Sequence, residues 1–437
     1  MKPQRVLVFT GKLGYQTRSF DAAAQKLGIE LSFVTDRCHQ LDDPWGDRAI
    51  AVHFESPEVA AYTVLEHVRQ GTQRVDGILA LGDRPAVAAA YVARGLGLTY
   101  NHPAAVEACR SKLRLREVFR DAGLPVPWFR AVPLHPAPEP ALLGISYPCV
   151  LKPLSLSAST GVIRANNREE FVSAAARVRR VLQSPEILAT REANLDHMLV
   201  EAYIPGREVA LEGLLTDGNL RTLAIFDKAD PLEGPFFEET IYVTPSRLGD
   251  ASVSGIERCA SDAVRALGLS HGPVHAEFRI NEQGVWPLEV APRPIGGLCS
   301  RALQFAHSET SQSRDLIGLE ELLLRHAVEF PVADFTREPA ASGVMMIPVP
   351  ASGILEAVDG QQEARDTQHI VGLEITARLH DYIAAWPEGS SYLGFLFARA
   401  ASPHQVEAAL RSAHAKLKFI MRERLAVEHP ATRRVSP

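Results

Sequence analysis

The stretch HAEFRINEQGVWPLEVAPRPIGGL, residues 275–298, decides how the rest of the chain is interpreted. Two strand-like runs flank the turn-forming segment 281–284, which predicts a β-hairpin. Each run carries one carboxylate, Glu277 in the first and Glu289 in the second. A hairpin loop of odd length would bring these side chains to one face of the sheet, whereas a shift by one residue would separate them. Gly284 tolerates the positive φ that a three-residue loop needs, so we predict an odd loop.

This hairpin predicts a metal site. Directly opposed residues have Cβ atoms about 4.5–5.5 Å apart, and two carboxylates that close repel each other unless a cation lies between them. Mg²⁺ suits the position because it takes oxygen ligands and combines one or two carboxylates with substrate phosphates, and Mn²⁺ is an alternative. An exposed hairpin with scattered acids is the other interpretation. The Arg-Pro-Ile-Gly-Gly segment argues against it, because Arg293, Gly296 and Gly297 add an anion-binding fork and bare backbone amides.

The composition restricts the class of protein. The chain has 437 residues, 46% hydrophobic and 22% charged, with a formal net charge of −6, which is typical of a globular protein of about two to four domains. This balance gives no support for nucleic-acid or membrane-surface binding, and no run of about 18 apolar residues predicts a membrane span. Five cysteines without a Cys-x-x-Cys pair favour a cytoplasmic location. We expect small-molecule substrates and, as the commonest assembly, a homodimer.

The order of the predicted elements indicates a multidomain α/β and α+β protein. Strands and helices alternate over residues 1–103, which predicts an open parallel α/β domain. We assign residues 104–335 to a second domain, with a subdomain at about 130–200. Residues 336–437 form a predicted C-terminal mixed α+β domain, in which short strands precede a final helix over about 403–423.

Two lysines and a hydroxyl-rich loop suit phosphate binding. Lys152 lies near the end of the predicted strand 147–153, and LSLSASTG follows at 154–161. Hydroxyls and amides donate hydrogen bonds and the lysine adds charge, so this segment predicts a phosphate-binding lid. Lys112 lies in a helix predicted over about 104–122. An ordinary Ser-rich turn and a solvated surface lysine are the alternatives for each feature alone.

Five separated motifs occur in one order: Ser111-Lys112 with GLPVP at 123–127, YPCVLKP with its serine loop, VEAYIPGREV at 200–209, the AEF…LEV carboxylate pair, and APRPIGG at 291–297. Together they resemble the ATP-grasp superfamily, in particular its carboxylate–amine ligases, the group that contains L-amino acid ligases. The resemblance covers residues 1 to about 423. It implies an ATP-grasp fold, ATP and Mg²⁺ as cofactors, and an ADP-forming ligase that joins a carboxylate, such as an amino acid, to an amine.

The resemblance also implies roles for individual residues. Two lysines, the lid, a hinge strand whose backbone contacts adenine and a ribose-binding glutamate would bind ATP: Lys112, Lys152, Ser157, Ser159, Gly161, Glu201, Ala202, Tyr203, Ile204 and Glu208. Glu277 and Glu289 would hold Mg²⁺. Arg293 would bind the reacting carboxylate or its phosphorylated form, helped by the amides of Gly296 and Gly297.

Three further residues are candidates for metal or substrate contact. Glu239, in a strand predicted over 236–243, would lie near the metal or the substrate amine by the same resemblance. His275 precedes Glu277 by two residues and so faces the same side of its strand, where it either contacts substrate or packs as a structural histidine. Lys228 is a weaker candidate for binding phosphate or a substrate carboxylate.

Two departures from the family pattern bear on the site. Ala291 stands where many members have asparagine, which removes one oxygen ligand and weakens a second metal position. The lid is serine-rich where relatives often have more glycine. Two other functions stay open: a biotin-carboxylase-like or purine-pathway enzyme that carboxylates or transfers formyl groups, and a nucleotide-binding protein without turnover.

Overall fold

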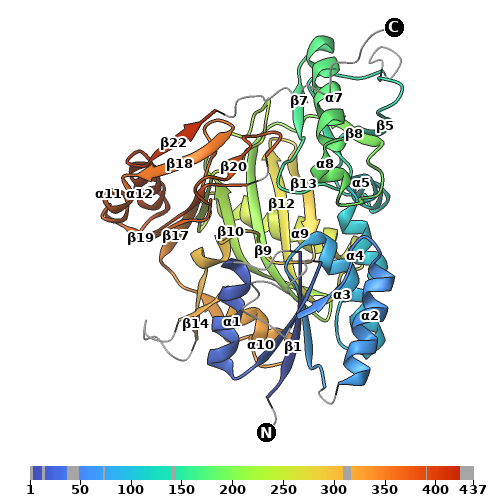
Figure 1. Cartoon of the computed structure of the whole chain (residues 1–437), viewed down its shortest axis with the longest axis vertical. Coiled ribbons are helices and arrows are strands. Elements are labelled where there is room, and N and C mark those ends of the chain that lie inside the picture. Colours follow the sequence, from blue (N-terminus) through green and yellow to red (C-terminus); the bar gives the residue numbers. More distant parts are fainter. Residues whose placement is uncertain are drawn as a thin grey trace.

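The computed structural model describes residues 3–11, 15–36, 49–71, 74–138, 144–308, 316–389 and 391–423. These residues form three lobes around a central sheet, with the N-terminal lobe in blue, a lobe carrying α7 in green and a C-terminal lobe in orange and red (Figure 1). None of the helices in these ranges is long and apolar enough to cross a membrane.

The N-terminal lobe is a parallel sheet in the order β3-β2-β1-β4, as the alternating pattern predicts. Its elements are β1 (Arg5–Thr10), α1 (Tyr15–Leu27), β2 (Glu30–Thr35), β3 (Ala49–Ala51), α2 (Pro57–Gln70), β4 (Gly77–Ala80) and α3 (Asp83–Leu96). Residues of α2 and α3 share a hydrophobic core with one face of the sheet. The other face packs with α1 and with α10 (Leu319–Ala327), a helix from much later in the chain.

The helix predicted over 104–122 is two helices. The break falls at Ser111, whose backbone is extended at φ −99° and ψ 112° and separates α4 (Pro103–Arg110) from α5 (Lys112–Asp121). The Ser111 side chain accepts a hydrogen bond from the Arg114 amide and so caps α5. The break places Lys112 on the first turn of a new helix.

The lobe that contains the predicted lid is an antiparallel sheet in the order β5-β8-β6-β7. Its strands are β5 (Phe129–Pro133), β6 (Cys149–Pro153), β7 (Ile163–Ala165) and β8 (His197–Ala202), and it also holds α7 (Arg168–Leu182) and α8 (Pro185–Leu188). One side of α7 packs on the sheet through Phe171, Ala174, Ala175 and Val178. The loop 154–161 joins β6 to β7 and so extends from the edge of this lobe.

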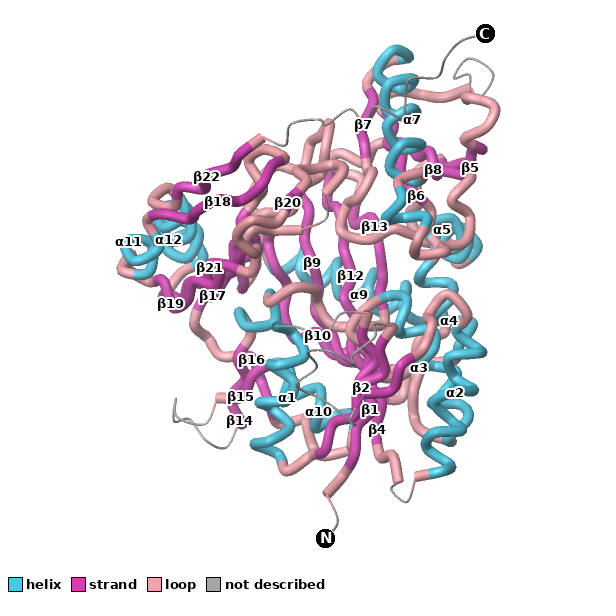
Figure 2. The backbone as a smooth tube through the Cα atoms, viewed as in Figure 1, coloured by secondary structure: helices cyan, strands magenta, loops and turns pink. Residues whose placement is uncertain are grey.

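The central sheet has eight strands in the order β13-β12-β9-β10-β11-β17-β21-β19 (Figure 2). They are β9 (Arg207–Thr216), β10 (Asn219–Lys228), β11 (Ile241–Thr244), β12 (Gly272–Asn281), β13 (Gly284–Ala291), β17 (Ala341–Ile347), β19 (Ile370–Ile375) and β21 (Gly394–Ala400). The sheet therefore continues across the domain boundary predicted near residue 336. The strand predicted over 236–243 starts only at Ile241, so Glu238 and Glu239 lie in the preceding loop.

Alternation along β12 separates the core from the site. Val274, Ala276 and Phe278 are fully buried and share a hydrophobic core with α9 (Asp250–Leu267). The alternate residues of the strand point to its other face. These are His275, Glu277 and Arg279.

The remaining elements complete the C-terminal lobe and a small sheet beside α10. The first group comprises β18 (Gly353–Asp359), α11 (Gln361–Arg365), β20 (Tyr382–Ile383), α12 (Pro403–His414) and β22 (Lys418–Arg422), and the second comprises β14 (Gln304–His307), β15 (Ile317–Gly318) and β16 (Phe335–Arg337). A single 3-10 turn, Cys299–Ala302, precedes β14. The final helix predicted over 403–423 is too long, because α12 ends at His414 and the alternating segment after it pairs with β18 as β22.

The β12–β13 hairpin has a loop of even length, yet Glu277 and Glu289 still lie on the same face of the sheet. Asn281 pairs with Gly284, so the loop has two residues and the predicted odd loop is wrong. Glu277 nevertheless pairs directly with Glu289, because the register shifts between Phe278–Pro287 and Glu277–Glu289. Leu288 is the extra residue, a β-bulge that offsets the even loop.

Candidate nucleotide and metal site

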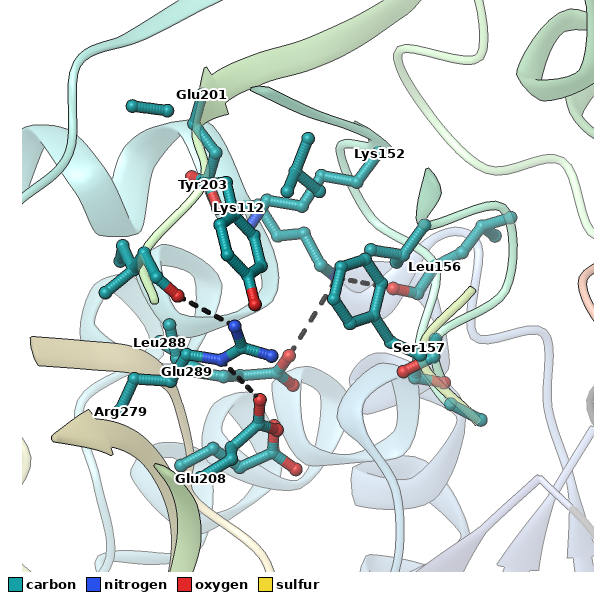
Figure 3. A pocket seen from close by; sticks show the side chains of 18 residues that line it. Lys112, Lys152, Leu156, Ser157, Glu201, Tyr203, Glu208, Arg279, Leu288 and Glu289 are labelled. Atoms are coloured by element: carbon teal, nitrogen blue, oxygen red, sulfur yellow. Dashed lines mark hydrogen bonds and ion pairs between the residues drawn. The ribbon is translucent and has the colours of Figure 1, made fainter. Parts of the chain in front are cut away.

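A pocket lies between the lid-bearing sheet and the β12–β13 hairpin (Figure 3). Most of the residues predicted to bind ATP or metal line it: Lys112, Lys152, Ser157, Ser159, Glu201, Ala202, Tyr203, Ile204, Glu208, Glu277 and Glu289. The other predicted residues do not line it: Gly161, Lys228, Glu239, His275, Arg293, Gly296 and Gly297.

Lys112 connects the lid to the metal hairpin. Its backbone amide donates to the Leu154 carbonyl at 2.9 Å, and its Nζ donates to the Leu156 carbonyl at 2.5 Å. The same Nζ lies 4.0 Å from Oε2 of Glu289 (Figure 3). One cation therefore stands between the first residues of the lid and a carboxylate of the hairpin.

Lys152 belongs to a buried ion cluster on the lid side of the pocket. Its Nζ lies 2.5 Å from Oε1 of Glu201, and the Arg116 guanidinium binds the same carboxylate through Nε at 2.9 Å. Burial lowers the pKa of Lys152 to about 8, although the charge of Glu201 opposes this shift. Burial alone would raise the pKa of Glu201, but Arg116 and Lys152 together lower it to about 2. Glu201 is thus a carboxylate shared by two cations.

The lid loop contacts the C-terminal lobe as well as the pocket. Ala158 and Ser159 adopt positive φ values of 54° and 53°, conformations that cost energy in residues with a Cβ atom. The Gly161 amide donates to the Pro387 carbonyl at 3.3 Å. Beside this contact, Arg177 of α7 makes a two-point ion pair with Glu388, with distances of 2.6 and 2.9 Å.

The hinge strand at 201–204 has part of its backbone already in use. The amides of Ala202 and Tyr203 donate to the Trp128 and Pro148 carbonyls at 2.8 and 3.0 Å. Arg279 of β12 donates from Nη1 to the Ile204 carbonyl at 2.7 Å. Its guanidinium carbon also lies 5.0 Å from the centre of the Tyr203 ring, within cation–π range.

Three carboxylates surround Lys228 on the acidic side of the site. Its Nζ lies 2.7 Å from Glu208 and 3.2 Å from Glu277, and it also contacts Glu239. Burial would lower the pKa of Lys228, but the three negative charges raise it well above 10.5. Burial raises the pKa of Glu239 to about 7 despite the attraction of Lys228, and the hydroxyl of Tyr242 donates to this carboxylate at 2.8 Å.

The donor set of this cluster fits a divalent metal. Glu208, Glu239 and Glu277 each offer an oxygen, and these atoms lie within 4.8 Å of one another. Hard carboxylate oxygens are the ligands that Mg²⁺ and Mn²⁺ prefer. Glu289 is the direct strand partner of Glu277 and approaches the same region from β13.

His275 joins the hairpin to the loop that follows it. Its Nδ1 contacts Glu212 of β9, and its Nε2 lies 3.4 Å from Oε1 of Glu277. The second oxygen of Glu212 accepts from the Ile295 amide at 3.2 Å. Burial would lower the pKa of His275, but Glu212 and Glu277 raise it to about 9.

Arg293 lies outside the pocket lining and binds the N-terminal lobe. Its Nε and Nη2 donate to the two oxygens of Asp83 at 2.7 and 3.3 Å. Burial would raise the pKa of Asp83, but the charge of Arg293 holds it below its usual value. Gly296 is exposed, and Gly297 has a φ of 64° with the Phe395 ring so close that a Cβ atom would lie 3.0 Å from it.

This geometry combines a lysine-lined lid, a hinge strand and an acidic hairpin around one pocket. Residues 145–302, which include all of these parts except Lys112, match the family described as ATP-grasp domain. The chain contains an ATP-grasp domain. Residues 345–422 match the family described as L-amino acid ligase C-terminal domain 2.

The chain is also similar to proteins of known name. The chain is similar to alanine–anticapsin ligase from Bacillus amyloliquefaciens, with 28% identity over 272 residues that cover 56% of this chain and 56% of the relative. The match thus spans little more than half the length of that relative. Crystal structures of L-amino acid ligase from Bacillus licheniformis and of phosphoribosylglycinamide synthetase from Anaerococcus prevotii superpose with TM-scores of 0.76 and 0.67. The L-amino acid ligase structure covers 97% of this chain and all of its own chain at 25% identity. The phosphoribosylglycinamide synthetase structure covers 96% of this chain and all of its own chain at 15% identity, so this second similarity concerns the fold alone.

Three residues of the ATP-grasp site were not predicted from the sequence. Arg279 follows Glu277 by two residues, the same spacing that placed His275 on the site face. Arg116 follows Lys112 by four residues and therefore lies on the same side of α5. Glu212 pairs directly with His275 across the β9–β12 ladder. The first two carried a periodicity signal, whereas the strand pairing of Glu212 depends on tertiary structure.

Proposed function

We propose that this chain is an ATP-dependent, ADP-forming ligase that joins a carboxylate to an amine, with amino acids as substrates. A free carboxylate is a poor acyl donor because its leaving group would be oxide. Transfer of the γ-phosphoryl group of ATP to a carboxylate oxygen gives an acyl phosphate and ADP. The amine nitrogen then attacks the acyl carbon, phosphate leaves with the bonding electron pair, and the nitrogen loses a proton to give the amide.

The chain must mainly place groups and balance charge, because phosphoryl transfer needs little covalent chemistry from the protein. We assign Mg²⁺ to Glu277 and Glu289, with Glu208 and Glu239 as neighbouring oxygen donors. When bound, the metal neutralises charge on the phosphate oxygens and on the developing transition state. Lys228 already compensates three of these carboxylates, which supports an acidic site that stays folded between turnovers.

We assign the ATP phosphates to Lys112, Lys152 and the lid residues Ser157, Ser159 and Gly161. Lys112, Lys152, Ser157 and Ser159 all line the pocket. The adenine edge lies at the hinge strand. Because the amides of Ala202 and Tyr203 already donate to carbonyls, the Ile204 amide is the proposed donor to the base.

We assign the reacting carboxylate to Arg293 and the amides of Gly296 and Gly297. The guanidinium carries five N–H donors, and Asp83 accepts from two of its nitrogens, so the arginine can bind a second anion while Asp83 fixes its orientation. The amine substrate lies toward Glu239, whose carboxylate can accept hydrogen bonds from an ammonium group.

The observation that carries this proposal is the direct pairing of Glu277 with Glu289 beside Lys112. Two carboxylates that could bind a metal and a lysine that could bind phosphate thus line the same pocket as the lid. The test is to incubate the protein with ATP, Mg²⁺ and a panel of amino acids and to measure nucleotide products. We expect release of ADP and phosphate that depends on an amino-acid pair.

The other outcomes discriminate between functions. Release of AMP in place of ADP would overturn the acyl-phosphate proposal. ADP release that depends on bicarbonate or formate would identify a carboxylating or formyl-transferring enzyme instead. Tight ATP binding without turnover on any acceptor would identify a nucleotide-binding protein.

A further inference from the structure

Arg116 is a buried arginine on which three separate elements of the ATP-grasp domain meet. Its side chain is 1% exposed, and it does not line the pocket. From α5 it donates to both oxygens of Glu201 in β8, through Nε at 2.9 Å and Nη2 at 3.3 Å. Its Nη1 donates to the Pro287 and Leu288 carbonyls in β13 at 3.2 and 3.0 Å.

The carbonyl contacts fall on the bulge that sets the metal hairpin. Leu288 is the extra residue between the Phe278–Pro287 and Glu277–Glu289 pairs. Without an inserted residue, Glu289 would point to the face opposite Glu277, because side chains alternate along a strand. A bulge interrupts the ladder hydrogen bonds, and Arg116 supplies donors to carbonyls at this interruption.

The carboxylate contacts fall on the partner of a phosphate-binding lysine. Glu201 holds Lys152 at 2.5 Å, and Arg116 shares that carboxylate. A Glu201 carboxylate bound only to Lys152 would neutralise the lysine more completely. By donating two hydrogen bonds to Glu201, Arg116 fixes the carboxylate and leaves positive charge in excess at the cluster.

We propose that Arg116 is a positioning residue that sets Glu289 for metal binding and Lys152 for phosphate binding at the same time. The inference rests on the proposed function, because it takes the nucleotide and metal roles of those two residues from it. The planar fork of arginine suits this task, since its five donors reach a carboxylate and two carbonyls together. A lysine carries the same charge but cannot hold both partners in one geometry.

The test compares Arg116→Lys and Arg116→Met with Arg114→Met, a matched control on the exposed side of the same helix. Mg²⁺-ADP affinity, the Mg²⁺ concentration for half-maximal ADP binding, and Tm are measured for each protein. For Arg116→Lys we expect the Mg²⁺ requirement to rise about 10–100-fold, the range typical of residues that orient metal ligands. Arg114→Met should bind as the wild type does.

Two further measurements separate positioning from plain stabilisation. In the Glu289→Gln background, Arg116→Lys should no longer change the Mg²⁺ requirement, because its effect passes through Glu289. In Arg116→Met, the pH midpoint of nucleotide binding should move upward, because the charge of Arg116 contributes to lowering the pKa of Lys152. Arg116→Lys keeps the charge and should keep that midpoint.

These measurements distinguish failure of the Arg116 inference from failure of the proposed function. If the wild type binds no nucleotide, the proposed function fails and this inference fails with it. If the wild type binds Mg²⁺-ADP and the Arg116 variants lose only Tm, Arg116 is a structural residue and the inference alone is overturned. If Arg116→Met does not fold, the Mg²⁺ requirement of Arg116→Lys alone decides.

Discussion

Lys152 and Lys228 both lie buried in the candidate site, and their surroundings move their pKa values in opposite directions. Lys152 shares one carboxylate, Glu201, with Arg116, and its pKa falls to about 8. Lys228 faces three carboxylates, and its pKa rises well above 10.5. At Lys152 burial outweighs the single shared carboxylate and lowers the pKa, whereas at Lys228 three carboxylates outweigh burial and raise it.

The difference matches what each half of the site would bind. A cluster with excess positive charge, formed by Lys112, Lys152 and Arg116, favours an anion such as a nucleotide phosphate. A cluster with excess negative charge, formed around Lys228, favours an added cation. The two clusters beside the pocket thus differ in charge, so a metal-bound polyphosphate would span them with its metal toward the acidic cluster and its phosphates toward the basic one.

The strongest test of this division removes one acid from the metal half. Glu289→Gln keeps the size of the side chain and deletes its charge. We expect kcat for ADP release to fall about 10²–10³-fold, because the metal contributes several kcal/mol of charge stabilisation and about 1.4 kcal/mol corresponds to a factor of ten.

The matched control is Glu282→Gln, the same substitution at an exposed position in the loop of the same hairpin. Its kcat should equal that of the wild type. Full activity in Glu289→Gln would remove Glu289 from the metal assignment.

The second test removes each lysine in turn and measures stability. Lys228→Met leaves three carboxylates without their shared cation, so we expect a loss of about 3–5 kcal/mol in the free energy of unfolding, as is typical when one partner of a buried ion cluster is removed. Lys152→Met leaves Glu201 paired with Arg116, and its loss should be smaller. Chemical denaturation in EDTA, followed by circular dichroism, measures both.

Added Mg²⁺ sharpens the same experiment. It should raise the stability of Lys228→Met more than that of Lys152→Met, because a bound cation replaces the missing charge only in the acidic cluster. Equal losses in the two variants, with equal responses to Mg²⁺, would show that the two environments do not differ in the way their charges indicate.

Much of this arrangement was accessible from the sequence where local periodicity determines structure. The alternation over β1–β4 predicted a parallel sheet, and the period of two placed His275 on the face of Glu277. The hairpin shows the limit of such reasoning. Its register depends on a bulge at Leu288, and no local signal distinguishes an odd loop from an even loop with one inserted residue, because both give the same pairing of Glu277 with Glu289.

The residues that the sequence did not reveal act through distant partners. Arg116 lies 171 positions from the Pro287 carbonyl that it binds, and Asp83 lies 210 positions from the predicted residue Arg293 that donates to it. A helical arginine or an acid after a strand is common, so neither pattern identifies its partner. Two predicted helix ends were wrong for a related reason. The helix predicted over 104–122 breaks at Ser111, next to the contact of Lys112 with the lid, and the end of the helix predicted over 403–423 is instead β22, which pairs with β18. In both places tertiary contacts outweigh local propensity.

The mildest test of the comparison changes the pH instead of the sequence, and Lys152→Arg is its control because Glu239 and His275, with pKa values of about 7 and about 9, titrate over the same range in both proteins. Lysine is charged below its pKa and neutral above it, so a value of about 8 in the nucleotide-free protein makes phosphate binding weaken through the alkaline range. If only the charged form binds, the Kd for ADP should rise about twofold at pH 8 and about tenfold at pH 9 relative to pH 7. Lys152→Arg stays charged over this range, so titration of residue 152 should not change its Kd. Any pH dependence that remains in this variant comes from other groups, including ADP itself. Calorimetry measures the Kd for ADP as a function of pH in both proteins. If the two curves are parallel, the charge of Lys152 does not contribute to ADP binding, and Lys112 is the lysine that binds the phosphates.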